Sequence, residues 1–186
     1  MEPTPKISQG SILASGLFLD NTCFKRSVVL LAEHNTERSI GFILNKPTDI
    51  KITDAVEDFP DFNSTLYFGG PAETDTLYFI HTLGDKLPGS KKITDDIYWG
   101  GNYEQLKLLV AIGKIQPHMI RFFAGYAGWE PSSVKEEVEE TNWMLSTFNR
   151  EIIFSKNSND LWRTVLRSMG GKYAITANYP EDPQWN

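Results

Sequence analysis

Residues 27–45 read SVVLLAEHNTERSIGFILN, and this stretch decides the fold. Its first part, residues 27–34, is rich in β-branched residues and leucine, which is typical of a buried strand. Residues 35–38 supply a turn, and residues 39–45 form the returning strand. Pro47 ends that strand because proline has no N–H to donate to a neighbouring strand. The stretch therefore predicts an antiparallel β-hairpin.

Outward from this hairpin, periodicity and turn residues predict further strands at residues 11–15, 65–68, 77–82, 93–99, 119–124, 151–154 and 173–176. Helices are expected after Asn102, after a capping box at Ser133 and Glu136 running toward Leu145, and from residue 158 to 169. Strands come mostly first and do not alternate regularly with helices. The order therefore favours an α+β fold with a mixed or antiparallel sheet over a doubly wound one.

Composition limits the class of protein. The chain has 186 residues, of which 40% are hydrophobic and 12% aromatic, so we expect one folded domain over residues 1–186. No apolar stretch reaches the ~18 residues needed to cross a bilayer, and the first nine residues do not resemble a signal peptide. The one cysteine, Cys23, excludes an internal disulfide and is compatible with a reducing compartment. We therefore expect a cytoplasmic protein that does not bind membranes.

Charge and motifs exclude several activities. The net charge is −6, and the only adjacent basic pairs are 25–26 and 91–92, so direct nucleic-acid binding is not expected. The Walker, nucleophile-elbow and HExxH patterns are absent. The three histidines, His34, His81 and His118, lie far apart and lack the spacing of metal ligands. We expect no metal, no cofactor and no catalytic residue of a standard motif.

Polar side chains at the ends of the two hairpin strands are candidates for binding. At the end of the returning strand, Asn45 and Lys46 offer an amide and an ammonium that can hold an anion, or Asn45 simply caps backbone groups before Pro47. At the tip of the first strand, Glu33 and His34 are a titratable pair suited to acid–base work. Side chains alternate across a strand, so we favour a purely structural role for that pair.

Two glycine-containing segments are further candidates. Gly69 and Gly70 can form an anion-binding nest or a plain turn, and the turn is favoured. The other segment reads GYAGW, residues 125–129, and its candidate residues are Gly125, Tyr126, Gly128 and Trp129. Its glycines indicate close approach of another backbone or of a ligand. We favour packing, with Tyr126 and Trp129 supplying apolar area and one polar group each.

At these segments the sequence resembles the AlgH/YqgE family of bacterial proteins. The resemblance rests on pieces that follow the family's order, namely EHN at 33–35, GFILNKP at 41–47, GGP at 69–71, IH at 80–81, GYAGW at 125–129 and LW at 161–162. It implies an α+β domain whose branched sheet is partly closed as a small barrel and surrounded by helices. Some members are labelled transcriptional regulators. The family supplies no catalytic residue to transfer.

This chain departs from the family pattern after GYAGW. Where the family usually has Gly-Gln-Leu-Glu, this chain has SSVK at residues 132–135, followed by two glutamates. The end of the chain, residues 179–186, also differs from the usual small-residue finish. Any binding that depends on the usual glutamine and glutamate is therefore not carried over.

The residues favour a non-catalytic binding or regulatory module whose partner is a protein or a small molecule. The alternative is a small-molecule enzyme without a standard motif, with Lys46, Asn45, His34 and Tyr126 as its candidate residues. In the predicted hairpin His34 and Asn45 are separated by roughly five strand residues, or ~17 Å, so one small active site cannot use both. A structural role is the third hypothesis.

Overall fold

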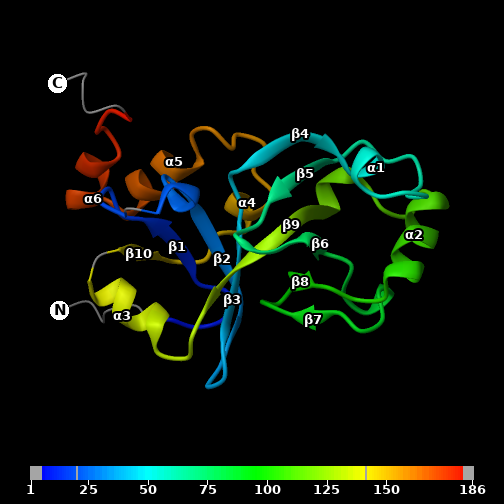
Figure 1. The fold of residues 1–186 in the computed structure, drawn as a ribbon, viewed down its shortest axis with the longest axis horizontal. Helices are drawn as coiled ribbons and strands as arrows, with labels where there is room; N and C mark the ends of the chain where they lie inside the picture. The colour runs from blue at the N-terminus through cyan, green and yellow to red at the C-terminus, as the bar shows by residue number, and fades with distance from the viewer. Residues whose placement is uncertain (1–5, 20, 141, 182–186) are drawn as a thin grey trace.

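The computed structural model describes residues 6–19, 21–140 and 142–181. Within these ranges the chain forms a mixed sheet of ten strands and six α-helices, which confirms the α+β expectation (Figure 1). The strands are β1 (Ile12–Ser15), β2 (Val28–His34), β3 (Ser39–Ile43), β4 (Pro47–Lys51), β5 (Thr65–Phe68), β6 (Ala72–His81), β7 (Lys91–Lys92), β8 (Tyr98–Trp99), β9 (Ile120–Trp129) and β10 (Trp143–Ser146). The helices are α1 (Ile52–Ala55), α2 (Tyr103–Ala111), α3 (Ser133–Glu139), α4 (Arg150–Ile153), α5 (Leu161–Met169) and α6 (Gly171–Thr176).

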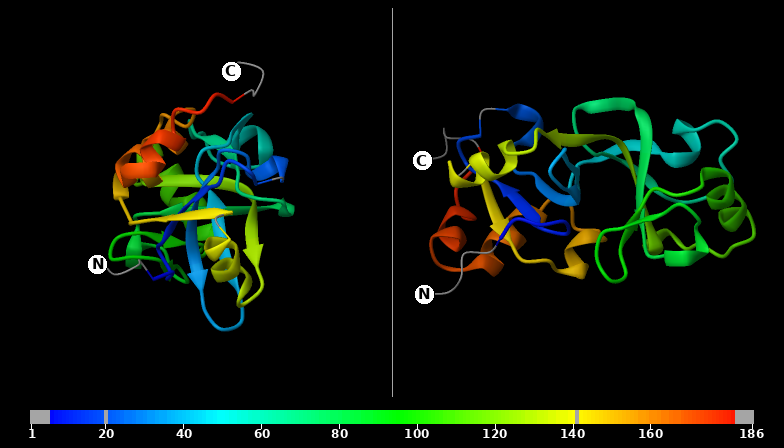
Figure 2. Two further views of the ribbon diagram at one scale, coloured as in Figure 1. Left: turned by 90° about the vertical axis from the view of Figure 1, so that its left-hand side faces the viewer. Right: turned by 90° about the horizontal axis from the view of Figure 1, so that it is seen from below.

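The sheet has the order β10-β1-β2-β3-β9-β6-β8-β7, and it branches at β9. The first part of β9 pairs with β6 on one side and, in parallel, with β5 on the other, while its last residues pair with β3. All other strand pairs are antiparallel. The sheet curls into a half-barrel, visible in the turned views (Figure 2). One long strand, β9, thus connects the two ends of the molecule.

The hairpin of β2 and β3 forms as predicted. His34 lies opposite Ser39, and Val29 lies opposite Ile43, with a β-bulge between Leu31 and Glu33. Both faces of β2 are covered: Leu30 packs toward α5, and its neighbours pack toward α3. This double coverage explains why the strand is a continuous apolar run rather than an alternating one.

The apolar residues on the two faces of β2 belong to two clusters, and a third apolar cluster lies at the α2 end of the molecule. It is rich in phenylalanine and joins β6 and β9 to α2. Asn102 caps α2 as predicted, because its side chain accepts a hydrogen bond from the N–H of Gln105. None of the helices in the described residues is long and apolar enough to cross a membrane.

Several sequence-based boundaries are wrong. Residues 151–153 belong to helix α4 and Phe154 is its C-cap, so no strand forms there, because Asn149 accepts a hydrogen bond from the N–H of Glu151 and starts a helical turn. Residues 173–176 belong to α6, whose N-cap Gly170 and first residue Gly171 both have positive φ. Of the strand expected at residues 93–99 only 98–99 form a strand, β8, whereas the short β7 lies before this range, and the strand expected at 119–124 runs on through GYAGW.

The helix expected from Ser133 toward Leu145 ends at Glu139. Its N-cap residue is Ser132, whose side chain makes no capping hydrogen bond. The chain then returns to the sheet as β10, which pairs with β1 and buries Trp143. Burial of a large indole beside the central strands overrides the local helical pattern.

Candidate functional site

The glycines predicted as candidates meet where the turn between β5 and β6 crosses β9. The Gly69 N–H donates to the carbonyl of Ala124 at 2.9 Å. A Cβ added to Gly69 would lie 2.2 Å from the Gly125 carbonyl oxygen, and one added to Gly70 would lie 2.1 Å from the Tyr126 carbonyl carbon. Gly70 and Gly125 also have positive φ, 152° and 72°. At this glycine crossing, backbone occupies the space that a nest would offer to an anion.

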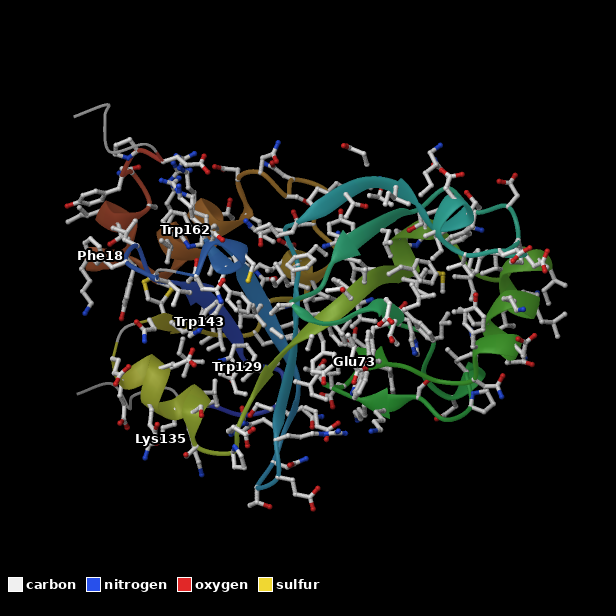
Figure 3. All side chains as sticks on the ribbon, in the orientation of Figure 1. Phe18, Glu73, Trp129, Lys135, Trp143 and Trp162 are labelled. Atoms are coloured by element: carbon white, nitrogen blue, oxygen red, sulfur yellow. The ribbon has the colours of Figure 1, made fainter. Side chains whose placement is uncertain are left out.

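The aromatic residues of GYAGW bond and pack within the protein. The Trp129 indole donates to Glu137 Oε2 at 3.1 Å, and the Trp143 indole donates to the same oxygen at 2.8 Å. The two indoles contact edge to face, and Figure 3 shows them beside α3. Glu137 is half-buried and accepts both indole hydrogen bonds.

The rest of this segment packs against β6. The Tyr126 ring lies edge to face on Tyr78, with 5.4 Å between ring centroids. A Cβ added to Gly128 would lie 3.2 Å from the Tyr126 ring. The cavities described below are lined by residues other than those of GYAGW.

Asn45 and Lys46 hold a neighbouring turn. The Asn45 side chain accepts from the Val28 N–H and donates to the Arg26 carbonyl, both at 2.8 Å. The half-buried Lys46 ammonium donates to the Lys25 carbonyl at 2.7 Å, and desolvation lowers the pKa of Lys46. Arg26 has a left-handed backbone, φ 51°. The two candidate residues thus stand behind Lys25 and Arg26 and position them.

Lys25 and Arg26 face a cavity of about 380 Å³ walled by Trp162 and by residues 179–181, which we call the cationic cleft. The Arg26 guanidinium lies over the Trp162 ring, 4.9 Å from its centroid, and donates to the Tyr179 carbonyl at 2.8 Å. The Lys25 ammonium donates to the Glu181 carbonyl at 3.3 Å. The cleft therefore holds main-chain carbonyls of a late segment of the chain itself.

Arginine and lysine gather here with one acidic residue, Glu181, in the same cleft wall. Arg163, next to Trp162, donates to the carbonyl of Ala177 at 3.1 Å. Desolvation, and then the charge of Arg163, lower the pKa of Arg26. Among the described residues, no carboxylate lies within 4.0 Å of the nitrogens of Lys25, Arg26 or Arg163. Phe18, 91% exposed, projects from the rim of the cleft (Figure 3).

In the sequence, Lys25 and Arg26 are only a short basic pair, and Trp162 is a core residue of a helix. Nothing local indicates that the two lie together. The family-like pieces NKP and LW do point to this place, because Asn45, Lys46 and Trp162 all adjoin Arg26.

The candidate residues of an enzyme do not form one active site. His34 bonds Ser39 Oγ at 2.7 Å at the tip of the hairpin, whereas Asn45 bonds Val28 at its base. The separation predicted from the hairpin is confirmed by the strand register.

His81 and Ser90 lie 3.1 Å apart, a spacing that also occurs in nucleophile–base pairs. The Leu83 N–H donates to His81 Nδ1 at 3.2 Å, so Nε2 carries the proton and donates to the Gly100 carbonyl at 2.9 Å. The imidazole therefore has no free lone pair to take a proton from Ser90. In the described residues no group of three or more histidine, cysteine or acidic side chains can hold a metal ion.

The α+β half-barrel places this chain among proteins of known fold. DIP2367 from Corynebacterium diphtheriae superposes with a TM-score of 0.79 at 19% identity, covering 96% of this chain and 95% of that one. The AlgH protein from Pseudomonas aeruginosa, solved in solution, gives a TM-score of 0.72 at 20% identity, covering 96% and 100%. These two structures share the fold with this protein.

Residues 12–174 match the model of a protein family described as AlgH-like. A UPF0301 protein of Chlorobium limicola is 41% identical over 181 residues, covering 97% of both chains. A UPF0301 protein of Cytophaga hutchinsonii is also 41% identical over 181 residues, covering 97% of this chain and all of that one. The chain belongs to the AlgH-like family, as the sequence motifs indicated.

Proposed function

We propose that this protein is a non-catalytic binding module whose cationic cleft holds an extended acidic segment of a partner protein. The observation that carries the proposal is the pair of hydrogen bonds from Arg26 and Lys25 to the carbonyls of Tyr179 and Glu181. The cleft already accommodates main-chain carbonyls, and on this proposal the segment of residues 179–181 occupies the place of the partner.

Charge favours an acidic partner. Lys25 and Arg26 have only carbonyl acceptors among the described residues, so a carboxylate brought into the cleft gains charge-assisted hydrogen bonds. The exposed Phe18 adds apolar surface at the same place, and the buried Trp162 supports the Arg26 guanidinium from below. An exposed aromatic ring beside cations suits recognition of a peptide, because peptide-binding sites contact both the side chains and the backbone of the peptide.

A regulatory role through protein binding also accommodates the regulator label that some family members carry. The overall charge of −6 argues against direct binding of DNA, and the single cysteine fits a reducing cytoplasm. On this proposal the whole chain acts as one domain, with Asn45 and Lys46 as positioning residues. Gly69, Gly70, Gly125, Tyr126, Gly128 and Trp129 then support the fold that presents the cleft.

The test is fluorescence anisotropy with a labelled peptide rich in aspartate and glutamate, compared with its amide analogue. We expect the acidic peptide to bind and Arg26→Gln to weaken it about tenfold, because a charge-assisted hydrogen bond is lost. Removal of the chain after Asn178 should raise the affinity, since the internal occupant is gone. Lys172→Gln is the matched control, because Lys172 lines the neighbouring cavity and should leave binding unchanged.

Equal affinity for both peptides, or no effect of Arg26→Gln, would refute the proposal. Salt-dependent binding of a DNA fragment through the same arginine would instead support a direct regulator.

A further inference from the structure

A buried arginine lies away from the cationic cleft, in the first part of β9. Arg121 is only 6% exposed. Its chain neighbours Ile120 and Phe122 belong to the phenylalanine-rich apolar cluster. Its guanidinium carbon lies 4.3 Å from the centroid of the Tyr67 ring, on the parallel neighbour strand β5. Since adjacent side chains in a strand point to opposite faces, Arg121 faces away from that cluster.

The hydrogen bonds of Arg121 leave much of its guanidinium free. Nη1 donates to the Leu44 carbonyl at 2.9 Å, and Nη2 donates to the Ser155 carbonyl at 2.6 Å. A guanidinium has five N–H groups, so three have no acceptor in the described part of the chain. No described carboxylate lies within 4.0 Å of it. A buried charge without a counter-ion is costly, and two carbonyls and one ring offset only part of that cost.

The guanidinium borders a cavity of about 470 Å³. This volume falls in the range of about 300–1,000 Å³ that is usual for small-molecule sites. His118 and Lys156 also line it, as do the polar residues Ser64 and Thr65, and no aspartate or glutamate does. The cavity therefore combines one buried cation with exposed basic groups, and it contains no acidic side chain to compete for them.

We propose that this Arg121 cavity binds a small oxyanion, the carboxylate or phosphate group of a metabolite, with Arg121 as its principal partner. The guanidinium matches the geometry of both oxyanions and forms its strongest hydrogen bonds with them. Lys156 and His118 then lie where they can contact the remainder of the ligand. The site is independent of the cationic cleft, because the two cavities share no residue.

The alternative is that Arg121 only ties Leu44 to Ser155. A tie of this kind uses two N–H groups and predicts no response to anions. The two roles are separable by titrating the full-length protein with inorganic phosphate and, separately, with succinate at constant ionic strength, using sodium chloride as the reference. Thermal unfolding is the readout, since a ligand of the native state raises the midpoint in a saturable way.

We expect at least one of the two anions to raise the midpoint beyond the chloride reference, and the preferred anion identifies the ligand class. The double variant His118→Gln/Lys156→Gln keeps Arg121 and alters only exposed groups, so it should fold and bind about threefold to tenfold more weakly. Arg121→Gln should abolish the response. Lys135→Gln on α3, which does not line the cavity, is the control and should respond like the natural protein.

If Arg121→Gln does not fold, the double variant alone decides. A response equal to that of chloride, or a double variant that binds both anions as well as the natural protein, would overturn the proposal.

Discussion

The glycine crossing comes from a conspicuous glycine motif and the cationic cleft from an ordinary basic pair, and the two regions differ in what their polar groups contact. At the crossing, Gly69, Gly70 and Gly125 bring backbone against backbone, and an added Cβ would meet a carbonyl or another main-chain atom. At the cleft, Lys25 and Arg26 project into an open cavity and bond carbonyls of a late segment of the chain. At the crossing, backbone atoms fill the space between the strands. In the cleft, two positively charged side chains line an open cavity.

The difference teaches that a short, unusual motif does not by itself indicate a site. GYAGW is needed for close packing of strands, and Trp129 bonds a glutamate of the protein itself. The unremarkable pair at residues 25–26 provides the groups that a partner can reach. Substitutions at the glycine crossing should therefore lower the free energy of unfolding, whereas substitutions at the cationic cleft should mainly weaken partner binding.

The largest effect is expected at Gly125. Gly125→Ala should lower the free energy of unfolding by about 3–5 kcal/mol, because the new Cβ would lie 2.5 Å from the Gly70 carbonyl oxygen. Gly113→Ala is the matched control, since Gly113 has φ 70° and no atom within 4 Å of the added Cβ, and should cost about 1–2 kcal/mol. Urea unfolding measures both. Equal losses would mean that crowding is not the reason for glycine at the crossing.

The next effect is expected at Glu137. Glu137→Ala removes the acceptor of two indole N–H groups and should cost about 2 kcal/mol in urea unfolding followed by tryptophan fluorescence. Glu137→Gln should cost less, because its amide oxygen still accepts. Glu139→Ala removes only an exposed ion pair with Lys135 and should change stability by less than about 0.5 kcal/mol. A loss as small at Glu137 as at Glu139 would place Trp129 outside the packed region.

A smaller, pH-dependent effect is expected from His81, which is buried at the end of β6. Burial lowers the pKa of His81 below its ordinary 6.5. The unfolded chain therefore binds a proton that the native imidazole does not, so this contribution to stability is complete above pH 6.5 and falls below it. The slope is at most about 1.4 kcal/mol per pH unit.

Unfolding at a series of pH values, compared with His81→Asn, measures this contribution. The Asn variant should lose this part of the acid sensitivity while still accepting from the Leu83 N–H. An unchanged pH profile in the variant would contradict the assignment. The rings beside His81 are those of Phe79 and Tyr98.

The smallest effect on stability is expected at the cleft. Lys25→Gln should change the free energy of unfolding by less than about 0.5 kcal/mol, because it alters one exposed side chain with a single carbonyl bond. Urea unfolding of this variant beside Glu137→Ala makes the comparison direct. A loss of 2 kcal/mol at Lys25 would mean that the cleft is part of the packed structure.

The α+β class, the hairpin and the family were predictable because they rest on local patterns. The apolar run of residues 27–34, the turn at Asn35 and the cap at Asn102 each act over a few residues. The errors fell where distant contacts decide. Trp143 lies outside the expected helix because it is buried on β10, which pairs with β1. Residues 151–153 are helical because Asn149 caps the start of α4.

By itself the sequence determined the central hairpin, the order of the motifs and the absence of standard catalytic patterns, since these depend on neighbours along the chain. Tertiary structure alone decided that Arg26 lies on Trp162 and that Arg121 faces a polar cavity. It also decided that the GYAGW glycines meet a second backbone. The physical reason is that charge desolvation and close approach depend on which distant segments share a volume, and no local pattern records that.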